Sequence, residues 1–495
     1  MSGSCPRSPR RALAGTLLFA TVLTLSACSS SGKSTTPPTN PASTTIAPAR
    51  TAPSAAVRPL GVTWMAGFAA PGTPAQYNKV GVIKVGPSSA KNVLVLEPGT
   101  SAGSAYFVPL AQWIVSTAPG WQVWSVERRE NLIEDQSELD RFKEGKASST
   151  QLYDYYLGYL KDSSVTSHFT MVPNSAVAFA KQWGMAVAVQ DLHRVIAAAQ
   201  TLGGKVVLGG HSLGGSVVTA YATWNFAGRA GAADLAGLVY IDGGSGTSPE
   251  TATAANLQVQ SLAPPTASPW LSFGGITAPY AGLFNASGSA AALRDPNAPS
   301  LGQTSGLLPA DIVPPQRVSN VGQYGYALNV ATSPASLIAA QAHLGTGVAT
   351  AGTVHGWNSA GALTPIARYA TMFSGASMHG VDGTEWYFPQ RLTDDTAAVD
   401  NGNANPAQQV LGVEATMGHD LPTDLLIYAF GARLGGAAVV QDARALATQS
   451  GIPAANLTLV NRQSTYAHND PAGAYPQNDF FQNLIPFLQK VANRK

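Results

Sequence analysis

A serine set between glycines is the first candidate for chemistry in this sequence. Residues 205–215 read KVVLGGHSLGG, so Ser212 follows a short apolar run and precedes a second stretch with helical spacing. Glycines on both sides let a strand and a helix approach closely, and a serine on such a strained turn can act as a nucleophile. The same Gly-x-Ser-x-Gly pattern recurs around Ser101, in GTSAG at 99–103, so the bare pattern does not choose between the two serines.

Regular alternation of strands and helices must position these serines. Short apolar runs between turn residues predict strands, and apolar residues three or four apart predict helices. The predicted strands cover residues 62–68, 80–85, 92–96, 121–126, 205–208, 235–241, 424–430 and 457–460. The predicted helices cover residues 104–118, 175–202, 213–226, 437–450 and 479–491. This alternation predicts an α/β fold with a mostly parallel sheet of about eight strands, flanked by helices.

Residues 245–419 interrupt the alternation. This stretch is rich in Gly, Ala and Pro and is far longer than an ordinary loop, so we expect a large cap insertion within one domain spanning residues 60–495. Its aromatic and methionine side chains would suit an apolar acyl pocket, but they could equally form the core of the insertion itself. They are Trp270, Phe273, Tyr280, Phe284, Trp357, Met372, Phe373, Trp386, Tyr387 and Phe388.

The serine turn and its surroundings resemble the α/β-hydrolase superfamily, in its lipase and esterase branch. The resemblance covers roughly residues 60–495 and is strongest in GHSLGG at 210–215. In that fold the loop after an early strand belongs to the oxyanion hole, and a later strand and helix hold the nucleophile. The resemblance therefore assigns Ser212 as the nucleophile and places Ser101 in the oxyanion loop.

The same resemblance implies where an oxyanion would bind. One backbone N–H comes from Leu213, directly after the nucleophile, and a second from the loop after the early strand, here Thr100. Members of the family often have His-Gly in that loop, whereas this chain has Pro98-Gly99. The flexible glycine is kept and the histidine is lost, which leaves the identity of the second donor open.

A serine hydroxyl needs a base to take its proton, and in this fold the histidine follows the last strand. His468 lies eight residues beyond Val460, in TYAHNDP at 465–471, and fits that position. The rejected histidines lie on the helix before the nucleophile (His193), inside the serine turn (His211) or in the insertion (His343, His355, His379).

The acid of the triad is less clear from the sequence. The family's usual position, after the strand at 424–430, reads GARLG and contains no carboxylate. Asp242 follows the preceding strand, at the carboxyl end where ligands gather, and is our preferred acid, although an aspartate there can also cap a turn. Asp442 is the alternative, and Asp470 is expected to fix the loop of His468.

The N-terminal segment predicts export and a lipid anchor. Three arginines precede an apolar run at residues 12–25, which is too short to span a bilayer and indicates a signal peptide over residues 1–27. The sequence LSAC at 25–28 resembles the bacterial lipobox, which implies that Cys28 carries the lipid. The Ser/Thr/Pro-rich stretch that follows predicts a disordered linker up to residue 59. We therefore expect a bacterial lipoprotein held at the outer face of the cell membrane through Cys28.

Composition and motifs narrow the class of function. Only 11% of residues are charged and the net charge is +2, with no basic block, so we expect no nucleic-acid partner. No HExxH, paired-cysteine, GxxxxGK[ST] or strand-linked GxGxxG motif is present, so we expect neither a metal nor a cofactor. The predicted activity is hydrolysis of carboxylic esters, of small molecules or lipids, through Ser212, His468 and Asp242. The alternatives are a cell-envelope acyltransferase and a catalytically inactive binding lipoprotein.

Overall fold

The computed structural model describes residues 60–244 and 249–494. The predicted signal peptide at 1–27, Cys28 and the linker up to residue 59 lie outside the described residues. Within those two ranges no helix is both long enough and apolar enough to cross a membrane.

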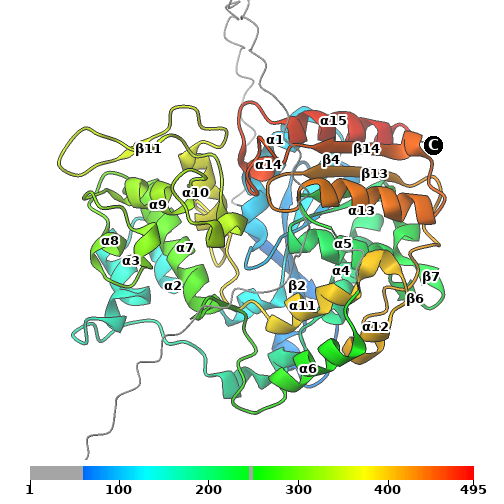
Figure 1. Cartoon of the computed structure of the whole chain (residues 1–495), viewed down its shortest axis with the longest axis horizontal. Coiled ribbons are helices and arrows are strands. Elements are labelled where there is room, and N and C mark those ends of the chain that lie inside the picture. The colour runs from blue at the N-terminus through cyan, green and yellow to red at the C-terminus, as the bar shows by residue number, and fades with distance from the viewer. Residues whose placement is uncertain (1–59, 245–248, 495) are drawn as a thin grey trace, which may run out of the picture. The chain divides into compact units, whose positions relative to one another are not determined.

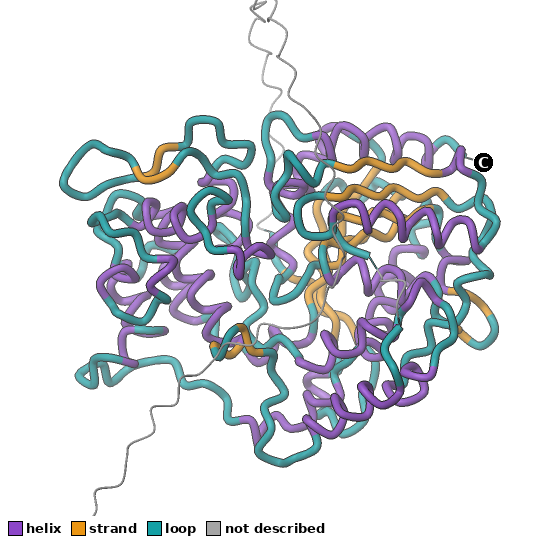
Figure 2. The backbone as a smooth tube through the Cα atoms, in the orientation of Figure 1, coloured by secondary structure: helices purple, strands orange, loops and turns teal. Residues whose placement is uncertain are grey.

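An eight-stranded sheet forms the centre of the fold (Figures 1 and 2). Its order is β1-β2-β4-β3-β5-β8-β13-β14, and all neighbours from β4 to β14 run parallel, while β2 is antiparallel to both β1 and β4. The strands are β1 (Val62–Ala66), β2 (Lys79–Val85), β3 (Asn92–Glu97), β4 (Trp121–Glu127), β5 (Val206–His211), β8 (Gly237–Ile241), β13 (Leu426–Gly431) and β14 (Leu457–Asn461). The predicted α/β class with a mostly parallel sheet of about eight strands is confirmed.

Side chains alternate between the two faces of the sheet along each strand, so both faces carry apolar side chains. A layer of helices covers each face. In β3, Val93 and Val95 face one apolar cluster, whereas Leu94 and Leu96 face the other. The first cluster contains side chains from the helices α4 (Met185–Gln200), α5 (Leu213–Ala222) and α13 (Gly436–Gln449). The second contains side chains from the helices α1 (Val108–Thr117) and α15 (Asp479–Ala492).

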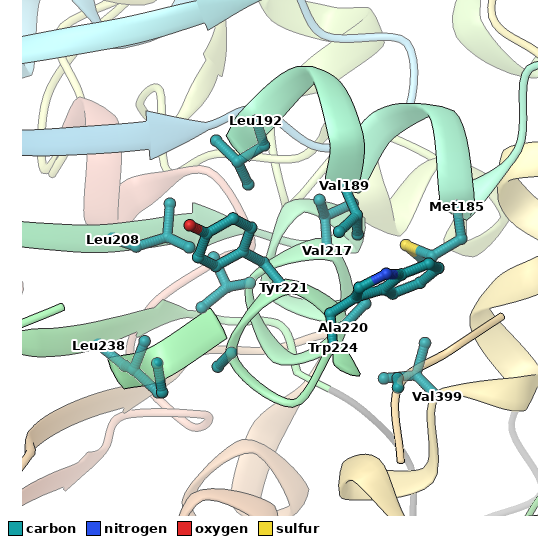
Figure 3. Close-up of a cluster of buried hydrophobic side chains, with 14 of the residues drawn as sticks. Met185, Val189, Leu192, Leu208, Val217, Ala220, Tyr221, Trp224, Leu238 and Val399 are labelled. Carbon is teal, nitrogen blue, oxygen red and sulfur yellow. The ribbon is translucent and has the colours of Figure 1, made fainter. Parts of the chain in front are cut away.

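The packing behind β5 supports the serine turn. Figure 3 shows Val189 and Leu192 of α4 near Val217 and Tyr221 of α5, with Leu208 of β5 beside them. All five side chains are almost completely buried. Burying a valine or leucine side chain contributes about 1.5–3 kcal/mol, so this contact anchors the strand and the helix that flank Ser212.

One helix begins later than the sequence predicts. Instead of a continuous helix over 175–202, a 3₁₀ stretch covers Asn174–Gln182 and α4 starts at Met185. The Asp395 carboxylate accepts the Met185 N–H at 2.8 Å, and a Cβ at Gly184 would lie 2.1 Å from that carboxylate. A distant aspartate therefore caps the helix and separates it from the preceding turn.

Part of the stretch between β8 and β13 forms a helical layer with an earlier segment, and this layer also contributes side chains to the second apolar cluster of the sheet. Helix α7 (Ala278–Arg294) shares a buried cluster with α2 (Ser137–Lys143) and α3 (Ser149–Tyr156), which follow β4. In Figure 1 these helices lie together beside the sheet, with α8 (Leu301–Thr304), α9 (Asn320–Leu328) and α10 (Ile366–Ser374). The layer is thus built from two places in the chain.

The remainder of that stretch packs on the sheet domain. Leu392 of α11 (Gln390–Asp395), Leu411 of α12 (Pro406–Leu411) and Ala255 of α6 (Ala252–Leu262) are buried in the same cluster as α4 and α5. These helices extend the layer that covers one face of the sheet. The short helix α14 (Asp470–Gly473) follows β14 and carries the chain away from His468.

Candidate active site

Ser212 lies on a sharp turn between β5 and α5. Its backbone has φ 55° and ψ −127°, a left-handed conformation that costs a residue with a side chain about 1–3 kcal/mol. A Cβ at Gly210 would lie 2.2 Å from the Gly214 carbonyl oxygen, and one at Gly214 would lie 2.2 Å from the Glu97 carbonyl oxygen. The two glycines are therefore required for β5, α5 and the end of β3 to meet around this serine.

The loop after β3 lies directly against Ser212. A Cβ at Gly99 would be 2.8 Å from the Ser212 Cβ, so this loop passes within contact distance of the serine. Ser101, in the second Gly-x-Ser-x-Gly sequence, also has a left-handed backbone, with φ 51°. Its carbonyl accepts the Glu385 N–H at 2.9 Å, and its hydroxyl is buried without a partner. Thr100 and Ser101 thus sit in the loop beside the serine turn.

His468 and Asp242 form a buried pair. His468 Nδ1 lies 2.6 Å from Asp242 Oδ2, and each residue is only 1% exposed. Asp242 follows β8, and a Cβ at the next residue, Gly243, would lie 1.9 Å from the Ser212 carbonyl oxygen. The structure therefore brings His468, Asp242 and the Ser212 turn together at the carboxyl edge of the sheet.

Backbone N–H groups hold the Asp242 carboxylate in its charged form. Oδ1 accepts from Ala432 at 2.6 Å, Gly435 at 3.0 Å and Gly436 at 3.2 Å, and Oδ2 accepts from Leu434 at 3.2 Å. Burial alone would raise the pKa of Asp242, but hydrogen bonds from His468 and the backbone outweigh burial and lower it. The loop after β13, which lacks a carboxylate of its own, thus supplies donors to a carboxylate on the neighbouring strand.

Asp442, the alternative acid, lies elsewhere. It is on α13, and its pKa is raised to about 7 by burial and by the nearby charge of Asp400. Its carbonyl accepts the Asn401 side-chain amide at 3.3 Å, which places that turn of α13 against residues 400–402. The structure thus pairs His468 with Asp242 and Asp442 with an acidic neighbour.

Asp470 fixes the loop that carries His468. Its fully buried carboxylate accepts the N–H groups of Ala467 at 2.7 Å and His343 at 2.9 Å, and the Thr364 hydroxyl at 2.8 Å. It also pairs with His343 Nδ1 at 2.5 Å. The loop of His468 is therefore tied to two segments between α9 and α10.

His211 supports His468 from inside the serine turn. Its Nε2 donates to the His468 carbonyl oxygen at 2.9 Å, and the two rings lie 4.3 Å apart. Burial lowers the pKa of His211 to about 3, with a further contribution from His468, so the ring stays neutral. Tyr106 stacks on His211 and donates its hydroxyl to Asn469 Oδ1 at 2.9 Å. Sequence reasoning assigned His211 no such role.

Most of the insertion's aromatic side chains serve as core. Trp270, Trp386 and Tyr387 are buried in the cluster shared with α2 and α3, and Phe373 packs edge-on against Tyr106.

Within residues 60–244 and 249–494, no group of three or more His, Cys, Asp or Glu side chains could hold a metal ion.

Comparison with known proteins gives distant structural neighbours. No protein-family model matches the sequence, and no curated protein does. A candidate lipase from Sulfolobus solfataricus is similar with a TM-score of 0.41 and 12% identity, over 87% of this chain and 92% of that one. A thermophilic esterase from Thermogutta terrifontis has a TM-score of 0.36 and 13% identity, over 87% and 99%. A carboxyl esterase from Bacillus coagulans has a TM-score of 0.36 and 10% identity, over 88% and 100%. At such scores the conclusions about function depend on the geometry of the site.

Proposed function

We propose that this chain, which has the α/β-hydrolase fold, is a serine hydrolase that cleaves carboxylic esters through an acyl-enzyme. Ser212 is the nucleophile, His468 the general base and acid, and Asp242 the residue that orients His468. The observation that supports this most directly is the 2.6 Å contact between His468 Nδ1 and Asp242 Oδ2, beside a serine held at φ 55°.

The chemistry follows from the tautomer that Asp242 selects. An ionised carboxylate only accepts hydrogen bonds, so His468 carries its proton on Nδ1 and leaves Nε2 free to take a proton. As the Ser212 oxygen bonds to the ester carbonyl carbon, its proton passes to Nε2, and the imidazolium then protonates the departing alcohol. Water repeats these steps on the acyl-enzyme, which releases the acid and restores the serine.

Two backbone N–H groups would stabilise the oxyanion. Leu213 is the first residue of α5, and the first N–H groups of a helix have no acceptor within the helix. Thr100 lies in the loop against Ser212 and supplies the second donor. Removing one such donor typically lowers the rate by about 10²–10³-fold, so both are needed for useful catalysis.

An anchor at the membrane completes the proposal. It rests on the signal peptide at 1–27 and on Cys28, whose acyl chains would tether the enzyme to the outer face of the cell membrane. The variant Cys28→Ala should move the protein from the membrane fraction to the soluble fraction with unchanged ester hydrolysis. Unchanged fractionation would rule out the anchor.

A fluorophosphonate probe tests the assignment of the nucleophile. The full chain is treated with the probe and assayed on short-chain p-nitrophenyl esters, alongside Ser212→Ala and the matched control Ser101→Ala. Ser212→Ala should lose both labelling and hydrolysis, and Ser101→Ala should keep labelling. If folded wild-type protein is not labelled, the proposal fails and a binding lipoprotein becomes the better explanation.

A further inference from the structure

We propose that Arg128 is a positioning residue for the oxyanion hole. It is the first residue after β4, and its guanidinium binds the loop that the proposed function assigns to the oxyanion. The inference rests on that proposed function and adds to it the residue that orients the Thr100 N–H.

Arg128 donates to three carbonyl oxygens of this loop. Nη1 contacts the oxygens of Gly99 at 3.4 Å and Ala102 at 3.3 Å, and Nη2 contacts those of Gly99 at 3.4 Å and Pro98 at a shorter distance. The guanidinium has five donors in a rigid fork, so one side chain can hold several carbonyl groups in fixed directions. The Gly99 oxygen also accepts the Ala102 N–H at 3.3 Å. Among residues 60–244 and 249–494, no other charged side chain donates a hydrogen bond to these three carbonyl oxygens.

The direction of the Gly99 carbonyl determines the direction of the Thr100 N–H. In a planar trans peptide the C=O and the following N–H point in opposite directions. Because the Gly99 oxygen faces Arg128, the Thr100 N–H faces away from Arg128. A Cβ added at Gly99 would lie 2.8 Å from the Ser212 Cβ, so Ser212 lies beside this peptide, and in the proposed arrangement the Thr100 N–H faces the serine side of the loop.

Two carboxylates hold Arg128 in place. Its Nε contacts Glu97 Oε1 at 2.8 Å, and its Nη1 contacts Glu385 Oε2 at 2.5 Å, with all three side chains at most 6% exposed. Glu97 ends β3 and leads into the loop, while the Glu385 N–H donates to the Ser101 carbonyl at 2.9 Å. The partners of Arg128 thus bracket the same loop from both sides.

The neighbouring residue fixes the far end of the loop. Glu127 Oε2 accepts the Ser104 N–H at 2.8 Å and also binds the Ser104 hydroxyl. The loop between them contains Ser101, whose left-handed backbone is unfavourable by about 1–3 kcal/mol and needs such support. Two consecutive side chains at the end of β4 therefore hold both ends of the oxyanion loop.

Arg129 provides a matched control for Arg128. It is adjacent, 1% exposed and paired with a buried carboxylate, since its Nη2 lies 2.6 Å from Asp191 Oδ1. Its hydrogen bonds beyond Asp191 go to Asn78 Oδ1 at 2.9 Å and the Phe68 carbonyl at 2.9 Å, which lie between β1 and β2. Like Arg128, Arg129 is buried and forms an ion pair with a buried carboxylate, but it does not touch the loop beside Ser212.

The experiment compares Arg128→Lys with Arg129→Lys in the full chain. Measurements are kcat and KM on a p-nitrophenyl ester, the Ki of a boronic acid that forms a tetrahedral adduct with serine, and the thermal midpoint. Lysine cannot hold three carbonyls in fixed directions, so Arg128→Lys should lower kcat by about 10–100-fold with KM within about twofold. The Ki should rise by a similar factor. Arg129→Lys should lower the thermal midpoint while kcat, KM and Ki stay within about twofold.

The outcomes separate this inference from the proposed function. If wild type is labelled and active but Arg128→Lys changes kcat and Ki no more than Arg129→Lys does, Arg128 is merely structural and the inference is wrong. If wild type is neither labelled nor active, the proposed function itself fails. Should Arg128→Lys not fold, Arg128→Gln, which keeps an amide donor near the carbonyls, is judged by the same criteria.

Discussion

Replacing Asp242 with asparagine removes one charge and leaves the shape of the side chain unchanged. The orientation of the amide is set by the surroundings, because Oδ1 accepts three backbone N–H groups whereas Oδ2 accepts one, from Leu434 at 3.2 Å, so the amide oxygen takes the place of Oδ1. The asparagine NH₂ then occupies the site of Oδ2 and points at His468 Nδ1. His468 must accept at Nδ1, so its proton moves to Nε2 and the base that Ser212 needs is lost.

This change of tautomer determines how far kcat should fall in Asp242→Asn. The equivalent loss in a serine-histidine-aspartate triad lowers kcat by about 10⁴-fold, which corresponds to about 5 kcal/mol of transition-state stabilisation. The fall in kcat is measured by steady-state hydrolysis of a p-nitrophenyl ester. Circular dichroism shows whether Asp242→Asn is folded. Fluorophosphonate labelling should slow by a comparable factor, since it uses the same base.

Asp442→Asn is the matched control for this prediction. Asp442 is on α13 and lies near Asp400, which belongs to a different segment, so its replacement should change kcat by less than about twofold. The reasoning is wrong if Asp242→Asn keeps more than about a tenth of wild-type kcat, or if Asp442→Asn loses as much activity.

Two further predictions concern the neighbours of Ser212. Gly99→Ala would place a Cβ 2.8 Å from the Ser212 Cβ and should lower kcat/KM more than about tenfold. In the control Gly244→Ala the new Cβ has nothing within 4 Å, so kcat/KM should be unchanged. Equal kinetics for the two variants would show that the loop is not in contact with the nucleophile. His211 has a pKa lowered from 6.5 to about 3, so between these values the unfolded chain binds a proton that the folded chain does not, and stability falls as pH falls. His211→Gln keeps a donor for the His468 carbonyl and should reduce this fall in the free energy of unfolding by up to about 1.4 kcal/mol per pH unit. Urea unfolding at pH 7 and pH 5 measures the difference. An unchanged pH dependence would contradict the neutral assignment of His211.

The sheet was predictable because its strands carry local signals. Each strand contains short apolar stretches, as in Leu94–Leu96 and Val206–Leu208, and these stretches are recognised without reference to distant contacts. Parallel strands bring their carboxyl ends to one edge, so a serine after β5, an aspartate after β8 and a histidine after β14 were expected to meet there.

The features of the fold that the sequence did not predict depend on contacts between residues that are distant in the chain. The start of α4 is set by Asp395, which lies 210 positions from Met185 and leaves no local trace. The stretch between β8 and β13 divides between two layers because Leu392 packs with α4 while Leu283 packs with α2, a difference that apolar patterning cannot show.

One signal for Arg128 was present in the sequence. Residues 127–130 read ERRE at the end of a strand that carries no other charged residue, in a chain with only 11% charged residues. Charged residues at the carboxyl end of a parallel strand lie beside the site, so this cluster could have been predicted to support it. Which of the two arginines binds the oxyanion loop depends on side-chain direction and was visible only in the structure.

The mass of the chain during turnover tests the acyl-enzyme at Ser212 most directly. Wild-type protein is quenched with acid while it hydrolyses p-nitrophenyl acetate, and its peptides are then identified by mass spectrometry. We predict one acetyl group on the peptide that contains Ser212, with none in Ser212→Ala and more in variants whose deacylation is slowed. Turnover of the ester with no acetylated Ser212, or with the acetyl group on Ser101, would contradict the mechanism.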